Sequence, residues 1–312
     1  MQAVEIVGPP RIVLMGVGDA GCNFLDALLC LPGGEQLECM AANTDAAALA
    51  RSHASTKLHL GTSWAGTGGM ISAGRAAAKS SRRTIRNALK HRHFLILVAG
   101  LGGGTGTGST PVIAKIARKM GIPVIAIVTR PFSFENGRER LARKGLRRLR
   151  RQTEAVITVS NDEPGVRRGQ DTTFNHMSRL IDKEVINLVR CFTSTILEPS
   201  MVNCDLSKVL DWLKGAGELS ALCITGTGES ALQDVLAAVQ AEDGIVARQL
   251  DGTRRVFVTI TESSALTMSS VRKIVRTIEQ YPAPDVFYIY ATTSEPDLGV
   301  DLRVTMITSR IR

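Results

Sequence analysis

The sequence predicts an α/β protein in which a parallel sheet wrapped by helices is followed by a long helix and a smaller α/β region. Three observations support this fold class. Short β-branched runs alternate with longer amphipathic segments through the first half of the chain. Apolar residues then recur every three or four positions over residues 171–196. After Pro199 further strand-like runs begin, which indicates a second, smaller region of mixed structure.

The short apolar runs predict the strands, because strands covered on both faces have nearly continuous apolar sequences. In the first region these runs are residues 11–15, 94–99, 124–128 and 155–159. The helices predicted between them include residues 23–30, 74–90 and 110–120. The smaller region has strand-like runs at residues 219–225, 256–260, 286–291 and 302–307. We therefore expect a first domain over residues 1–170, a connecting helix over 171–198 and a C-terminal domain over 199–312.

Length and composition exclude several classes of protein. With 312 residues, of which 44% are hydrophobic, the chain can form more than one core. Its apolar runs are far shorter than the roughly 20 residues that cross a bilayer. Residues 1–10 lack the features of a signal peptide, so a cytoplasmic location is expected. The six cysteines form no C-x-x-C pair and the five histidines have no ligand spacing, which argues against disulfides and structural zinc.

A first glycine-rich loop follows the first predicted strand and opens a helix. It reads Gly16-Val17-Gly18-Asp19-Ala20-Gly21 and matches the G-x-G-x-x-G phosphate-binding pattern in the required context. One interpretation is a dinucleotide site, for which Asp45 stands near the position of the ribose-binding acid. The other is a tight strand-to-helix turn. This loop alone leaves both open.

A second glycine-rich loop, residues 102–109, lies between the predicted strand 94–99 and a helix opened by Pro111. It reads Gly-Gly-Gly-Thr-Gly-Thr-Gly-Ser. Five glycines in eight positions are entropically costly for a turn that has only a structural role. Such a loop offers closely approaching backbone N–H groups, hydroxyls and a helix N-terminus to an anionic phosphate. No Lys-Ser or Lys-Thr pair follows, so it is not a Walker A loop.

The second loop resembles the signature loop of the tubulin/FtsZ superfamily, and further similarities follow in the family's order. Residues 16–23, 43–45, 66–75 and 129–135 resemble its other nucleotide loops, and Asn161-Asp162 resembles its Asn-Asp pair. Residues 302–305 resemble its last strand, so the likeness covers nearly the whole chain from Ile12. The resemblance implies a Rossmann-like GTP-binding domain with a parallel sheet, a long central helix and a smaller α/β domain.

The resemblance also implies GTP or GDP as the ligand, with Mg²⁺ carried by the nucleotide, and assigns the residues that bind it. Glu135 is expected at the ribose, and Asn161 with Asp182 at guanine. Met177 falls where the family stacks an aromatic ring, and either Arg138 or Arg140 is expected at a phosphate. The remaining residues expected at the nucleotide are Gly16, Gly18, Gly21, Cys22, Asn23, Asn43, Asp45, Gly68, Gly69, Gly102, Gly103, Gly104, Thr105, Gly106, Thr107 and Gly108.

The chain departs from the family at the loop that completes the catalytic site of the next subunit in a head-to-tail filament. The family loop reads Asn-x-Asp-x-x-Asp, and here Asn203 and Asp205 are followed by Lys208. A carboxylate can polarise the attacking water, whereas an ammonium group cannot accept its proton. Weak GTPase activity is therefore expected. The resemblance further indicates a divergent FtsZ-like protein without the family's C-terminal tail.

Eight basic residues lie between Arg138 and Arg151 and carry much of the formal charge of +9. They indicate either a solvated helix or a surface that binds an anionic partner. The partner would be an acidic lipid surface or an acidic protein. Nucleic acid is disfavoured because no aromatic residues are interleaved.

Three functions are compatible with these observations. The first is a filament-forming GTPase, as a homopolymer or a copolymer with another FtsZ-like protein, in cell division, intracellular positioning or membrane remodelling. The second is a non-hydrolysing GTP-binding accessory or switch module. The third, a dinucleotide-dependent oxidoreductase, is disfavoured because such an enzyme does not need the second glycine-rich loop.

Overall fold

The computed structural model describes residues 10–162, 173–198, 204–241, 244–263, 266–281, 285–295 and 300–310. The chain divides into two compact units, Met1–Val189 and Arg190–Arg312. The division falls within the long helix α8 (Phe174–Leu197), which the sequence predicts over residues 171–196. Pro199, expected to end this helix, lies outside the described residues.

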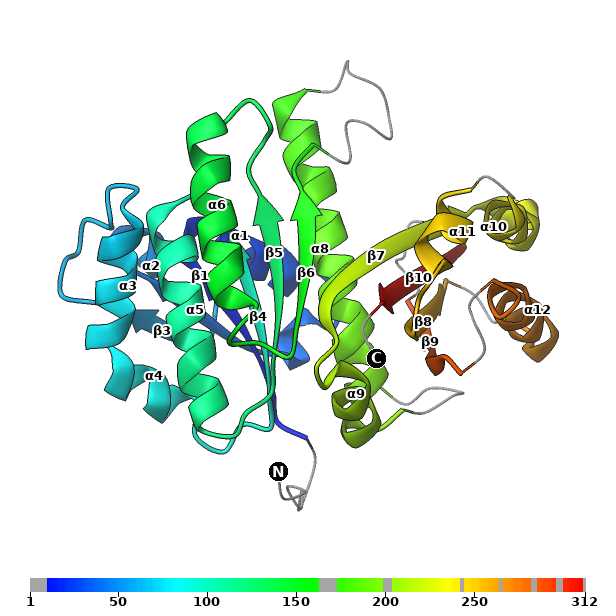
Figure 1. Cartoon of the computed structure of the whole chain (residues 1–312), viewed down its shortest axis with the longest axis horizontal. Coiled ribbons are helices and arrows are strands. Elements are labelled where there is room, and N and C mark those ends of the chain that lie inside the picture. The colour runs from blue at the N-terminus through cyan, green and yellow to red at the C-terminus, as the bar shows by residue number, and fades with distance from the viewer. Residues whose placement is uncertain are drawn as a thin grey trace. The chain divides into compact units, whose positions relative to one another are not determined.

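The described residues of the first unit form six parallel strands in the order β3-β2-β1-β4-β5-β6 (Figure 1). Their bounds are β1 (Ile12–Val17), β2 (Glu38–Asn43), β3 (Thr56–His59), β4 (Phe94–Gly100), β5 (Val124–Arg130) and β6 (Ala155–Ser160). The strands β1, β4 and β5 are buried along almost their whole length, because helices cover both faces of the sheet. The predicted parallel α/β class is confirmed.

The helices of this unit follow the strands in alternation. They are α1 (Gly18–Leu29), α2 (Ala46–Arg51), α3 (Ile71–Ser80), α4 (Arg82–Ala88), α5 (Gly104–Lys119) and α6 (Asn136–Leu149), with a short 3₁₀ turn η1 (Gly34–Gln36). Aliphatic side chains from β1, β4 and β5 pack against α3, α4, α5 and α6 in one continuous core.

Two helices differ from the prediction. The segment 74–90 forms two helices that meet at Ser81, whose Oγ accepts a hydrogen bond from the Gly61 N–H at 2.8 Å. Helix α5 begins at Gly104, so Pro111 lies inside it rather than opening it. The expected loop 102–109 is therefore mostly helix. Gly108 lets α5 approach α3 closely, because a Cβ at this position would lie 2.4 Å from the Ile71 carbonyl oxygen.

The second unit has a four-stranded sheet in the order β7-β10-β8-β9, in which β10 is antiparallel to β7 and β8, while β8 and β9 are parallel. The strands are β7 (Gly217–Gly226), β8 (Arg255–Glu262), β9 (Phe287–Ser294) and β10 (Leu302–Ser309). The helices are α9 (Leu206–Leu213), α10 (Ala231–Gln240), α11 (Ile245–Leu250) and α12 (Met268–Ile278), with a 3₁₀ turn η2 (Gly228–Ser230). Aliphatic residues of α10, α11 and α12 pack on β8 and β10.

No helix within the described residues combines the length and the apolar character needed to cross a membrane.

Candidate functional site

A polar cavity of about 430 Å³ lies in the first unit, at the carboxyl ends of β1, β2, β4, β5 and β6. Ligands of parallel α/β proteins bind at this edge of the sheet, where the loops after the strands converge. The residues expected at the nucleotide that line the cavity are Gly18, Asn43, Asp45, Gly68, Gly69, Gly103, Gly104, Thr105, Gly106, Glu135, Arg138 and Asn161.

The first glycine-rich loop contributes Gly18 to the cavity, together with Val17, Asp19 and Ala20. Gly18 has a φ of 73°, which favours glycine. Gly16 and Gly21 pack against each other instead, since a Cβ on Gly16 would lie 2.3 Å from the Gly21 carbonyl oxygen. Cys22 is buried, and burial, reinforced by Asp26 and Asp19, raises the pKa of its thiol to about 12. Asn23 is exposed. Of these expected site residues, only Gly18 lines the cavity.

Hydrogen bonds join the loops around the cavity. Asn43 Nδ2 donates to Asp19 Oδ1 at 2.8 Å, and Asn43 Oδ1 accepts from the Thr44 N–H at 2.8 Å. The hydroxyl oxygens of Thr44 and Thr105 are 2.6 Å apart, which links the end of β2 to the start of α5. Asp45 caps α2 by accepting from the Ala48 N–H at 2.9 Å. These contacts fix the lining before any ligand binds.

The second glycine-rich segment turns sharply before α5 begins. Gly102 has a φ of 108°, and its N–H donates to Thr107 Oγ1 at 2.8 Å. Gly103 is the N-cap of α5 and has no atom within 4 Å of a would-be Cβ. Gly104, Thr105 and Gly106 form the first turn, whose N–H groups have no partner within the helix. Thr107 is buried, and neither it, Gly102 nor Gly108 lines the cavity.

The charges of the lining are unusual for an anion site. Asp19, Asp45 and Glu135 contribute carboxylates, and Arg138 is the single cation among the lining residues. Arg138 Nη1 is bonded to Glu135 Oε2 at 2.8 Å. Attraction for a phosphate at this cavity must therefore come from backbone N–H groups and the N-termini of α1 and α5.

The structure distinguishes between the two arginines proposed at a phosphate. Arg138 lines the cavity, whereas Arg140 is exposed and is absent from the lining. Asn161, directly after β6, also lines it, and among the described residues its buried Oδ1 has no hydrogen-bond partner. A buried acceptor without a donor is unfavourable in the free protein, and so it suits a ligand that brings a donor.

The residues expected on α8 do not line the cavity. Met177 and Asp182 are both partly buried. Burial raises the pKa of the Asp182 carboxyl above its ordinary value. A group that faced solvent would not show this shift.

Of the three residues expected to act in catalysis, two are described, and both belong to the second unit. Asp205 is the N-cap of α9 and accepts from the Lys208 N–H at 2.8 Å. The Lys208 side chain is exposed in the first turn of this helix. Asn203 lies outside the described residues.

The cavity also has lining residues that the sequence did not single out, among them Thr67, Thr129 and Pro131. Thr129 and Pro131 belong to a segment already matched to the family, at the end of a strand. Thr67 likewise lies in a matched segment, residues 66–75, between Gly66 and Gly68.

A parallel sheet with a glycine-lined polar cavity at its carboxyl edge defines a nucleotide-binding class of α/β protein. Comparison with known proteins identifies the family. Residues 11–163 match the model of the tubulin/FtsZ family GTPase domain. The cell division protein FtsZ of Neisseria gonorrhoeae is 31% identical, covering 99% of this chain and 80% of that protein. That of Mycoplasmopsis pulmonis is 32% identical, covering 98% and 78%.

A solved empty FtsZ dimer of M. jannaschii has the same fold, with a TM-score of 0.88 and 27% identity, covering 97% of this chain and 88% of that one. The chain therefore belongs to the tubulin/FtsZ family.

Proposed function

We propose that this protein binds GTP in the cavity of its first unit and assembles head to tail in the cytoplasm, with slow GTP hydrolysis. The observation that carries the proposal is the cavity itself. Backbone N–H groups of Gly18 and of the first turn of α5 would hold the phosphates, and Glu135 would contact the ribose. The Oδ1 of Asn161, buried without a partner among the described residues, would accept a donor of guanine. Asp182 of α8 does not line the cavity in the free protein, and we propose it as the second acceptor from the family resemblance alone.

The donor set also fits a nucleotide that brings its own cation. Three carboxylates and one paired arginine give the lining a negative balance, which disfavours a bare triphosphate. A Mg²⁺ ion bound to the phosphates would reduce the repulsion between their negative charge and that of the lining. We therefore propose Mg-GTP, rather than free GTP, as the ligand.

Assembly is proposed from the family's head-to-tail arrangement, in which the loop before α9 faces the nucleotide of the next copy. Asp205 and Lys208 would then reach that nucleotide together. Cell division, intracellular positioning or membrane remodelling are the processes that such a filament would serve. We also propose that the chain can copolymerise with another FtsZ-like protein. Residues 138–151 would bind an anionic partner, which is either an acidic lipid surface or an acidic protein.

The test measures GTP-dependent sedimentation and phosphate release on one sample, with GDP and ATP as controls. We expect sedimentation with GTP and Mg²⁺, slow phosphate release, and neither with ATP. Absence of GTP binding would overturn the proposal.

A second function, a GTP-binding module that neither hydrolyses nor polymerises alone, is favoured by Lys208. GTP binding without sedimentation or phosphate release would select this function. Electron microscopy of the purified protein with GTP distinguishes the two proposed functions directly, because only the first predicts filaments.

Replacing Lys208 by aspartate is expected to raise GTP turnover about tenfold or more, because a carboxylate can accept the proton of the attacking water. The fold should tolerate the change. Lys208 occupies the first turn of α9, where an acidic side chain interacts favourably with the helix dipole and a lysine does not.

The matched control for Lys208→Asp is Lys214→Asp, because Lys214 is also exposed and lies at the other end of α9. Phosphate release is measured at saturating GTP for both variants. Unchanged turnover in Lys208→Asp, with GTP binding and sedimentation intact, would show that the slow step lies elsewhere.

The Asp182→Asn variant is expected to bind GTP more weakly than the parent near neutral pH. Its affinity for GTP should no longer fall as the pH is lowered. Burial raises the folded-state pKa of Asp182, so its negative charge opposes folding, and this penalty is relieved as the pH falls through the folded pKa. GTP binding requires the ionised acceptor. The parent's affinity should therefore fall as the pH is lowered from neutral through the raised pKa of Asp182.

Titration of fluorescent GTP across this range checks the Asp182 prediction, with Asp211→Asn, an exposed acid of α9, as the control. If the GTP affinity of Asp182→Asn depends on pH as that of the parent does, Asp182 does not contact the nucleotide.

A further inference from the structure

The basic residues between Arg138 and Arg151 do not form one surface. Arg138 pairs with Glu135 at the nucleotide cavity. Arg143 Nε donates to Glu139 Oε1 at 2.9 Å, and Arg130 binds the same carboxylate. Burial alone would raise the pKa of Glu139, but these two arginines outweigh it and hold the pKa below its ordinary value. This part of the run is therefore engaged within the protein.

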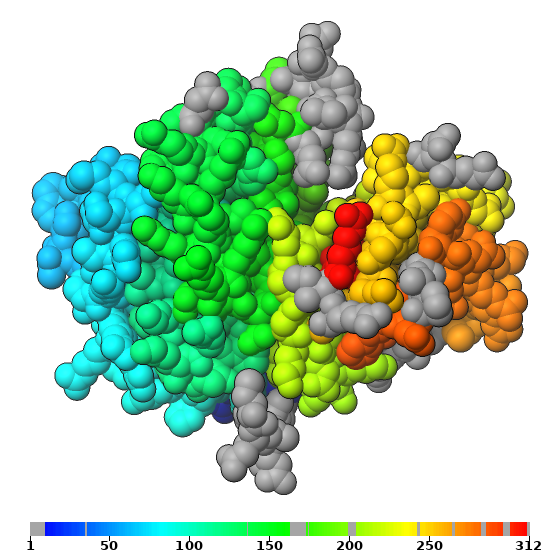
Figure 2. Space-filling view, in the orientation of Figure 1, coloured from blue at the N-terminus to red at the C-terminus, as the bar shows by residue number. Residues whose placement is uncertain are grey.

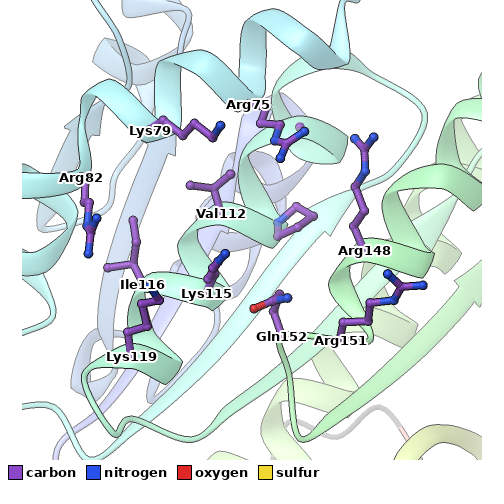
Figure 3. A pocket seen from close by; sticks show the side chains of 12 residues that line it. Arg75, Lys79, Arg82, Val112, Lys115, Ile116, Lys119, Arg148, Arg151 and Gln152 are labelled. Carbon is purple, nitrogen blue, oxygen red and sulfur yellow. The ribbon is translucent and has the colours of Figure 1, made fainter.

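The end of the run contributes instead to a second cavity, the basic groove, of about 490 Å³. One wall is formed by Arg75 and Lys79 on α3 and by Arg82 on α4 (Figure 3). In Figure 2 the cyan surface of α3 and α4 adjoins the green surface of α5 and α6 on the face turned toward the viewer. The groove is thus assembled from helices that are separate in sequence.

The opposite wall carries Arg148 near the end of α6 and Arg151 just beyond it, while Lys115 and Lys119 rise from α5 between the walls (Figure 3). All of these cations are exposed. No carboxylate lines the groove, and none of its cations forms an ion pair within the described part of the chain. Convergent like charges repel one another, so the arrangement favours a bound anion.

The floor of the groove restricts the kind of anion. The half-buried side chain of Val112 on α5 provides an aliphatic surface between the cations, and the buried Pro111 and Ile116 also line this floor. A purely ionic ligand leaves this surface unused, whereas a ligand with anionic and apolar groups covers both. Gln152 adds an amide at the edge, and its buried Oε1 has no partner within the described ranges, so it can accept a backbone N–H.

Two other classes of polyanion fit less well. Single-stranded nucleic acid binds through aromatic stacking, and no aromatic residue lines the groove. A bilayer surface is broad, whereas these cations line the walls of a concave site.

We propose that the basic groove binds an extended acidic peptide segment of a partner protein, with its carboxylates on the arginine and lysine walls and an apolar side chain on the floor. The inference refines the anionic partner proposed above, and it does not depend on nucleotide binding.

The test uses fluorescence anisotropy with a labelled peptide of repeating Asp-Glu-Leu, about ten residues long, which spans roughly 33 Å when extended. It is performed with the full chain and without nucleotide, so its failure is separate from a failure of GTP binding. Saturable binding that weakens with salt is expected. A peptide of repeating Asp-Glu-Ser should bind several-fold more weakly, because it cannot cover the floor.

The decisive variant combines Arg75→Glu, Lys115→Glu and Arg148→Glu, and should lose about tenfold or more in affinity. The matched control combines Arg83→Glu, Arg86→Glu and Lys90→Glu, which alters the net charge equally at exposed positions outside the groove.

A second variant, Val112→Ser, keeps every charge and tests the floor. It should weaken binding of the Asp-Glu-Leu peptide and leave the Asp-Glu-Ser peptide unaffected.

Three outcomes would overturn the proposal. Equal losses in the two triple variants would indicate unspecific attraction to net charge. Tighter binding of an oligo-dT strand, or of phosphatidylglycerol vesicles, with the same dependence on the groove residues would assign the groove to nucleic acid or to membrane. Absence of peptide binding to the folded parent would leave the groove without its proposed ligand.

Discussion

Gly106→Ala is expected to destabilise the first unit by about 2–3 kcal/mol, despite the better helix propensity of alanine. A Cβ at this position would lie 2.3 Å from the carbonyl oxygen of Gly100 at the end of β4. That oxygen belongs to the backbone of a buried strand and cannot rotate away. The helix must move from the sheet, and its packing on the core is lost.

Thermal unfolding without nucleotide measures this loss directly, with Gly103→Ala as the control. Gly103 belongs to the same loop, has a φ of −88° that alanine tolerates, and has open space around a would-be Cβ. The control should stay within about 1 kcal/mol of the parent, the usual scale for an N-cap change. If Gly106→Ala unfolds at the parent's temperature, the close contact between α5 and β4 is not required.

These two glycines show how far the sequence could predict the site. The density of glycines predicted a phosphate-binding loop, and Gly103, Gly104 and Gly106 line the cavity. The sequence could not separate glycines that face a ligand from those that allow close packing. Gly108 packs on α3, a contact between segments more than thirty positions apart. Only the folded chain brings these segments together.

In the sheet of the first unit, the strands with long apolar runs were predicted, whereas β2 and β3, whose sequences are more mixed, were missed. Strands β4 and β5 have unbroken aliphatic sequences and were found. Strand β2 has the sequence Glu-Cys-Met-Ala-Ala-Asn, and alanine is a poor strand former. Its position is set by pairing with β1 and β3, a tertiary effect that local propensity does not contain.

The basic run illustrates the same limit for charge. Along the sequence its residues form one cluster, which predicts one surface. In the structure Glu135 and Glu139 engage part of it, while α3, α4 and α5 bring further cations to Arg148. Partners that are distant in sequence therefore decide which cations can bind an external anion.

Asn161→Ala is expected to reduce GTP affinity about thirtyfold or more, because a site that hydrogen-bonds its ligand loses most when that bond is removed. The free protein should keep its stability or gain slightly, since the buried Asn161 Oδ1 has no partner in the described part of the chain. Both quantities are needed: anisotropy with fluorescent GTP gives the affinity, and thermal unfolding without nucleotide gives the stability.

The pair of results separates a ligand-binding role of Asn161 from a structural one. An asparagine that held the fold would show the reverse pattern, a lower unfolding temperature with unchanged affinity, and that outcome would contradict the prediction. Asn87→Ala, at an exposed position of α4, should change neither quantity. Asn161→Asp keeps an acceptor and should retain more affinity than Asn161→Ala. Because guanine presents neighbouring N–H donors where adenine does not, loss of this acceptor should also reduce the preference for GTP over ATP.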